Sequence, residues 1–190
     1  MKDEETGSEW SHLLGASMAG PMKDQPLKII PSVMTNWGAW LKRYPDTTAT
    51  MIEPTATSFD TQMLKANPDW FGLGLVHSGQ QRLWRYDGLA KQPLINEEFA
   101  ELSLVVFFDV ESQTPAAWNR KLNDDTLQFT KTAQGVQDTN TKSTWDLLTG
   151  EAIDGPLKGS QLDAVPAIVT FSRPWRRFHK NTTLWRPASD

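Results

Sequence analysis

The stretch from Leu102 to Val110, LSLVVFFDV, contains the longest clear apolar run of the chain and decides its fold class. Branched and aromatic residues of this kind favour β-strands, and a short apolar run is typical of a strand inside a sheet. We therefore expect a central strand here. The run is far shorter than the roughly 18 apolar residues that a membrane-spanning helix needs, so we expect no membrane span.

Signals for further short strands lie on both sides of this run. His77-Ser78-Gly79 supplies turn chemistry for a hairpin between Phe71 and Trp84, and Asn123-Asp124-Asp125 supplies it for another turn. The other expected strands cover residues 116–122, 127–132, 143–147, 152–153 and 168–171. Helix signals are few and lie at residues 38–44, 58–66, 87–91 and 173–179. We expect a mainly β fold: a compact sandwich or open barrel of short antiparallel strands, with one or two short helices.

A comparison of the chain with itself reveals one internal similarity, at an offset of 135 positions. Without gaps, residues 8–48 share 13 identities with the segment that begins at Ser143, where chance gives roughly two or three. Many of the identical residues are Gly, Pro and Trp, which fix turns and fill cores. The two segments are therefore expected to share a fold. Four tryptophans match in pairs, Trp10 with Trp145 and Trp40 with Trp175. We expect all four in the core of the shared fold.

This similarity predicts how the chain is organised. Residues 1–50 read as the C-terminal part of a first repeat unit, residues 51–70 as a connector, and residues 71–188 as a complete second unit. A partial unit of strands leaves one strand edge unpaired. The organisation therefore favours a protein partner or an oligomer.

The composition excludes several classes of function. The chain has 190 residues, nine tryptophans, no cysteine and a formal net charge of −4. Without cysteine there is no disulfide, thiolate metal site, iron–sulfur cluster or cysteine nucleophile. The mild acidity argues against a nucleic-acid partner. The sequence has no phosphate loop, dinucleotide fingerprint or zinc-type histidine pair, so we expect no cofactor and no metal.

Three carboxylates of the second segment are weak candidates for catalysis. Asp146, Glu151 and Asp154 match Ser and Ala residues in the first segment, so the shared fold does not require them. Two such groups at a suitable distance can perform acid–base chemistry or hold a hard cation. The plainer interpretation is that they cap turns or face water in a Gly-rich region.

Four further residues are weak candidates for binding. Trp37 and Trp185 have no matching tryptophan in the other segment, and an exposed Trp often anchors a partner. Arg176 and Arg177 lie in a basic, aromatic stretch of a type that binds anions. The plainer interpretations are core packing for the tryptophans, and a short helix with its aromatic side chains inward and its arginines outward.

Several of these motifs together resemble one known family. Thr141 to Asp146, Gly150, Gly155-Pro156-Leu157, Gly159 and Leu162 are similar to the signature of the domain-of-unknown-function family 3179 (DUF3179). The similarity continues through Trp175, Phe178 and Thr182 to Trp185. It covers residues 71–188, and residues 5–50 match the end of a preceding unit.

The resemblance implies bacterial or archaeal proteins, often exported, with two units in tandem. It also implies a Cys-x-x-Cys type motif in many units, and with it thiol redox chemistry or metal binding. This chain departs from that pattern, because Asp109 and Ser112 stand where cysteines are expected. Thiol chemistry is therefore excluded for this chain alone.

Three functions remain open at this point. The first is a non-catalytic binding or assembly module of a larger complex. The second is an enzyme that uses Asp146, Glu151 or Asp154, with or without a metal. The third is the non-thiol partner of a redox protein. The charged start of the chain, Met1 to Glu5, shows no signal peptide, and only the resemblance suggests export.

Overall fold

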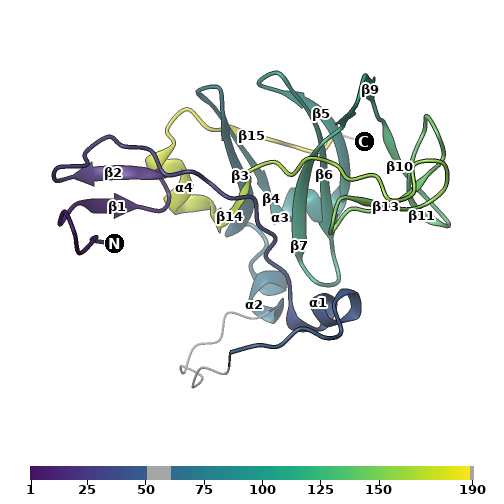
Figure 1. Ribbon diagram of the computed structural model, residues 1–190, viewed down its shortest axis with the longest axis horizontal. Coiled ribbons are helices and arrows are strands. Elements are labelled where there is room, and N and C mark those ends of the chain that lie inside the picture. The colour runs from purple at the N-terminus through teal and green to yellow at the C-terminus, as the bar shows by residue number, and fades with distance from the viewer. Residues whose placement is uncertain (51–60, 189–190) are drawn as a thin grey trace.

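The computed structural model describes residues 1–50 and 61–188. The protein is mainly β, as expected, and its strands form several small sheets (Figure 1). The strands are β1 (Glu9–Ser11), β2 (Ala16–Ala19), β3 (Phe71–His77), β4 (Gln80–Arg85), β5 (Leu94–Phe99), β6 (Leu102–Asp109), β7 (Thr114–Asn119), β8 (Lys121–Leu122), β9 (Asp125–Thr126), β10 (Phe129–Thr132), β11 (Gly135–Asp138), β12 (Thr144–Asp146), β13 (Glu151–Asp154), β14 (Ile168–Phe171) and β15 (Thr183–Leu184). The helices are α1 (Trp37–Arg43), α2 (Thr61–Ala66), α3 (Tyr86–Lys91) and α4 (Ser172–Phe178).

The number of helices differs from the expectation of one or two. The described residues form four, each of six or seven residues. Tertiary packing rather than intrinsic propensity stabilises helices of this length. No helix in the described ranges is long and apolar enough to cross a membrane.

The predicted central strand, β6, is the middle strand of the sheet β5-β6-β7. Its side chains alternate between two hydrophobic clusters. Leu104, Val106 and Phe108 belong to the first cluster, and Val105 belongs to the second. The continuous apolar run is explained by this position, because both faces of the strand are covered.

Two further sheets cover the two faces of this middle sheet. On one side lies the sheet β14-β3-β4-β15, in which β15 pairs parallel to β4 and the other pairs are antiparallel. On the other side lies the antiparallel sheet β10-β11-β12-β13. The arrangement is a layered, open structure, and the described residues form no closed barrel.

The hairpin β1–β2 projects from one end of the molecule, away from the middle sheet (Figure 1). One contact between it and the body is the hydrogen-bond distance of 2.9 Å between Nε2 of His179, at the end of α4, and the carbonyl oxygen of Leu13. The chain then crosses to the other end of the sheets, where Thr114 of β7 donates a hydrogen bond to Thr35 (2.7 Å between the Oγ1 atoms) and α1 follows.

Candidate functional site

Two hairpins that lie 135 positions apart have the same local geometry. β1 and β12 have three residues each, and β2 and β13 have four. Both pairs contain a register shift at the same place, before Trp10 and before Trp145. The helices that follow, α1 and α4, also start and end at matching positions and have seven residues each.

A tryptophan–aspartate hydrogen bond anchors each hairpin. Trp10 donates from Nε1 to Oδ2 of Asp3 (2.9 Å), and Trp145 donates from Nε1 to Oδ2 of Asp138 (3.0 Å). These aspartates also lie 135 positions apart, and the sequence comparison missed them because it began at Ser8. A comparison extended five positions upstream would have found them.

These hydrogen bonds lower the pKa of both aspartates. The bonds donated by the indole of Trp10 and by Thr6 lower the pKa of Asp3 to about 2. Burial by itself raises the pKa of Asp138, but the bonds from Trp145 and its neighbours hold it below its ordinary value. Both aspartates are therefore ionised acceptors that fix the hairpins.

The two hairpins differ in what covers them. Trp145 is 3% exposed and Leu162, which follows the second hairpin, is 1% exposed, whereas Leu27 at the matching first position is 37% exposed. Trp118 of β7 lies over the turn of the second hairpin and donates from Nε1 to the carbonyl of Leu147 (2.7 Å). None of the described residues covers the first hairpin in this way.

The segments that follow the two hairpins, residues 163–165 and residues 28–30, also differ in whether other residues contact them. Asn119 donates its backbone N–H to Asp163 (2.9 Å), and Val165 donates to Ala117 (3.1 Å), so residues 163–165 add an edge to β7. The matching residues 28–30 form no backbone hydrogen bond within the described ranges. Ile30, the counterpart of Val165, is 76% exposed.

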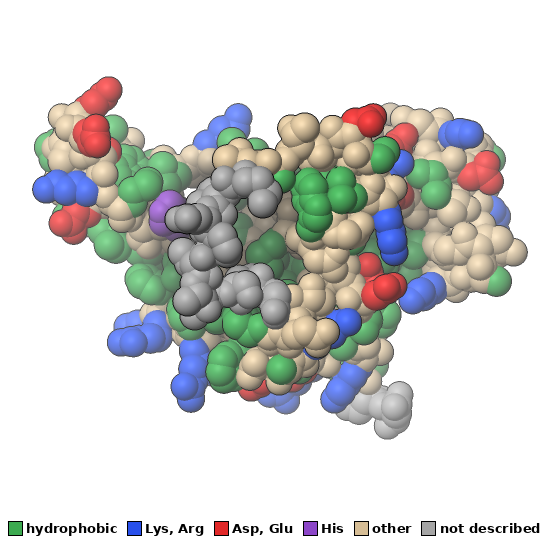
Figure 2. Space-filling view, turned by 90° about the horizontal axis from the view of Figure 1, so that it is seen from below, with side chains coloured by type: hydrophobic (Ala, Val, Ile, Leu, Met, Phe, Trp, Pro, Cys, Tyr) green, Lys and Arg blue, Asp and Glu red, His purple; other side chains and the backbone are tan. Residues whose placement is uncertain are grey.

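We define the first-hairpin face as Trp10, Met22, Leu27 and Ile30. Their counterparts all belong to the second hydrophobic cluster or lie in the core beside it: Trp145, Leu157, Leu162 and Val165. Figure 2 shows hydrophobic side chains at the surface of the hairpin end of the molecule, at its left. The first-hairpin face is therefore exposed apolar surface at positions where the second hairpin is covered.

The three candidate carboxylates do not form one site. Asp146 and Glu151 are brought together by Arg43 of α1, whose Nε lies 2.9 Å from Asp146 and whose Nη2 lies 2.8 Å from Glu151. Asp154 is exposed, and no ion pair or hydrogen bond of its side chain occurs within the described residues. Arg43, which sequence reasoning did not single out for this role, thus fastens α1 to the second hairpin.

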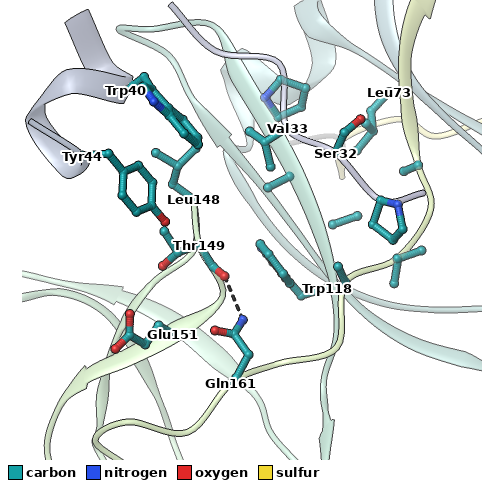
Figure 3. Close-up of a pocket in the computed structure, with 17 residues that line it drawn as sticks. Ser32, Val33, Trp40, Tyr44, Leu73, Trp118, Leu148, Thr149, Glu151 and Gln161 are labelled. Carbon is teal, nitrogen blue, oxygen red and sulfur yellow. Dashed lines mark hydrogen bonds between the residues drawn. The ribbon is translucent and has the colours of Figure 1, made fainter. Parts of the chain in front are cut away.

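A cleft of about 490 Å³ lies beside this ion-pair bridge (Figure 3). Trp40 of α1 and Tyr44, which follows this helix, form one wall, and Trp118 forms another. Gln161 donates to the carbonyl of Thr149 across its lower edge (2.8 Å). The cleft is mostly apolar, and the described residues contain no cluster of His, Asp or Glu that could hold a metal.

The four candidate binding residues lie in different surroundings. Trp37 is 50% exposed at the edge of a small cavity with Ser112, whereas Trp185 is partly buried and packs against Gly88. Arg176 and Arg177 are both exposed, and Arg176 lines a cavity at the start of α4. Of the tryptophans expected in the core, Trp145 and Trp175 are buried while Trp10 and Trp40 are partly exposed.

The two residues at the expected cysteine positions lie side by side, Asp109 at the end of β6 and Ser112 in the turn that leads to β7. Ser112 donates from Oγ to Oδ2 of Asp109 (2.6 Å). The turn is therefore closed by a polar contact in this chain.

Comparison with known proteins gave a match to one family. The sequence model of the family described as "Protein of unknown function (DUF3179)" matches residues 1–62 and again residues 60–182. Neither the curated proteins nor the solved structures gave a match.

Proposed function

The chain belongs to the DUF3179 family of proteins of unknown function, and from this premise we propose that it is a non-catalytic assembly module that binds a second polypeptide through its first-hairpin face. The observation that carries this proposal is the contrast between Leu27, 37% exposed, and Leu162, 1% exposed, in hairpins of the same geometry.

The organisation of the chain underlies the proposal. The two family matches and the shared hydrogen bonds support two copies of one unit. In this interpretation residues 1–50 are the later part of one unit, residues 51–70 are a connector, and residues 71–188 are a nearly complete unit.

The second unit indicates what the partner looks like. Its hairpin is covered by β7, which offers a strand edge and the indole of Trp118, and by β10 and β11. The partner is therefore a chain that presents two features. One is a strand like β7, with a tryptophan at the position of Trp118, and the other is a pair of strands like β10 and β11. A second copy of this chain does not fit, because residues 163–165 already occupy the edge of its β7.

Burial of this face and its backbone hydrogen bonds would both favour such an interface. Full burial of an exposed side chain of this size contributes about 1.5–3 kcal/mol. Ile30, at 76% exposed, would gain most of this, and Leu27 and Met22, each 37% exposed, would gain a smaller part. Hydrogen bonds from the free backbone of residues 28–30 add to this and fix the register. Together they offset much of the roughly 4–15 kcal/mol that association costs.

The two other hypotheses are less well supported. An enzyme that uses Asp146 and Glu151 would have to release both from Arg43. The redox hypothesis becomes a special case of the assembly proposal, in which the bound partner carries the cysteines.

The proposal is tested by capture from extracts of the source organism, with variants that differ only at the surface. Leu27→Asp with Ile30→Asp alters the first-hairpin face, and Ile153→Asp, at a position 43% exposed in the covered hairpin, is the matched control. We expect the parent and the control to retain a protein that carries the family pattern of residues 71–138, and the double variant to lose it. Capture of the same proteins by all three variants would refute the proposal.

A further inference from the structure

A second cavity, of about 550 Å³, lies where the first turn of α4 meets the start of β3 and the end of β4. Its walls combine two kinds of side chain. Trp70 and Phe171 supply aromatic surface, and Arg85, Arg173 and Arg176 supply positive charge. No part of the assembly proposal uses this cavity.

The charge of the cavity is not neutralised from within. Among the described residues, neither Arg173 nor Arg176 forms an ion pair or a side-chain hydrogen bond. Arg85 is paired with Asp87, and Asp69 is the one carboxylate in the described lining. The cavity therefore keeps an excess of positive charge, which favours an anion.

The aromatic side chains are unusually exposed for their size. Trp70 is 54% exposed and Phe171 is 45% exposed. Phe171 is held in place by the ring of Phe71, at 4.8 Å between centroids. Flat apolar walls of this kind bind a flat ring by stacking.

One polar group at the cavity wall has no partner in the protein. Ser172 is 6% exposed, and its Oγ forms no hydrogen bond within the described residues. A buried hydroxyl without a partner costs free energy unless a ligand satisfies it.

The matching helix shows that the fold does not require these arginines. In α1 the positions of Arg173 and Arg176 are taken by Gly38 and Leu41, yet both helices have the same bounds. By contrast, the position of the buried Trp175 is also occupied by a tryptophan, Trp40, in α1. Arg173 and Arg176 are therefore free to serve a function.

We propose that this cavity binds a small anion attached to a flat ring, such as an aromatic phosphate ester or carboxylate. The anionic group lies between Arg173 and Arg176, and the ring lies against Trp70 and Phe171.

The test uses the full chain with three probes: phenyl phosphate, inorganic phosphate and phenol. Binding is followed by the shift of the Trp70 indole signal in nuclear magnetic resonance spectra. We expect phenyl phosphate to bind at least roughly tenfold more tightly than either other probe, because ring and anion are both recognised.

Three variants separate the contribution of the arginines to anion binding from that of the aromatic side chains to ring binding. Arg173→Gln with Arg176→Gln should weaken phenyl phosphate binding by roughly tenfold or more. Lys180→Gln, at an exposed position just beyond the same helix that does not line the cavity, should leave binding unchanged. Trp70→Ala, followed by the Phe171 ring signals, should remove the preference for phenyl phosphate over inorganic phosphate. Equal binding by the double variant and the Lys180 control, or no binding of phenyl phosphate by the parent, would overturn the proposal.

Discussion

Leu27 and Leu162 occupy matching positions after two hairpins with the same hydrogen bonds, but Leu27 is 37% exposed and Leu162 is 1% exposed. The hairpin geometry therefore does not depend on the layer that covers it. It depends on local bonds, among them those of Trp10 and Trp145 to their aspartates.

The buried tryptophan–aspartate bond should contribute more to stability than the exposed one. Asp138→Ala leaves the buried indole N–H of Trp145 and the partly buried backbone N–H of Thr141 without acceptors. We expect a loss of about 2–4 kcal/mol in the free energy of unfolding, measured by urea denaturation. Asp3→Ala is the matched control and should cost clearly less. Equal losses of unfolding free energy for the two variants would contradict the conclusion that only the second hairpin is covered by other residues.

Stability should also depend on pH through the same two aspartates. Their pKa values are lowered in the folded state, to about 2 for Asp3, against about 3.9 for an unfolded Asp. Their contribution is therefore complete above about pH 5 and is lost as the pH falls from about 4 toward 2. Urea midpoints between pH 7 and pH 3 measure this loss. Asp138→Asn should flatten the acid slope, and an unchanged slope would argue against the role of Asp138.

Two matching glycines should respond differently to substitution. A Cβ at Gly150 would lie 2.6 Å from the ring of Trp118, whereas a Cβ at Gly15 would have Ile29 as its nearest neighbour, at 3.6 Å. Both have positive φ, so both changes strain the backbone. We expect Gly150→Ala to cost about 2–4 kcal/mol and Gly15→Ala about 1 kcal/mol, from thermal unfolding. A larger effect at Gly15 would mean that its turn is covered after all.

The ion-pair bridge of Arg43 should hold α1 locally and add little to global stability. Its side chain is 35% exposed, so Arg43→Ala should cost only about 0.5–1 kcal/mol. Amide exchange in α1 should speed up, and added salt should reduce the difference from the parent. Lys42→Ala, at the exposed neighbouring position, is the control. Unchanged exchange in α1 of the Arg43 variant would show that other contacts hold the helix.

Much of the fold could be predicted because its signals are local. The run from Leu102 to Val110 and the turn at His77 to Gly79 indicated β6 and the hairpin β3–β4. The parallel pairing of β15 with β4 could not be predicted, because it joins residues about 100 positions apart and leaves no periodic pattern. The four helices overlap the four stretches with helix signals. The expectation of one or two was too low because tertiary contacts stabilise such short helices.

The sites were harder to predict than the fold. The sequence drew attention to Asp146 and Glu151, but their partner Arg43 comes from the other segment, more than 100 positions away. Trp70 was not singled out, because nothing in its sequence surroundings distinguishes an exposed tryptophan from a buried one. The exposure of Leu27 became meaningful only beside the burial of Leu162.

A chain extended by its own residues 71–135, placed directly before Met1, would supply the covering layer that the first hairpin lacks. The direct measurement is amide exchange at Ile30 in this extended chain, since the backbone N–H of the matching Val165 donates to the carbonyl of Ala117. We predict that exchange at Ile30 slows by roughly 100-fold relative to the parent. Gly15→Ala should abolish the slowing, because the added copy of Trp118 would no longer fit against this position, as Trp118 does against Gly150. Exchange at Ile30 as fast as in the parent, with the added segment folded, would contradict the proposal that this face binds such a layer.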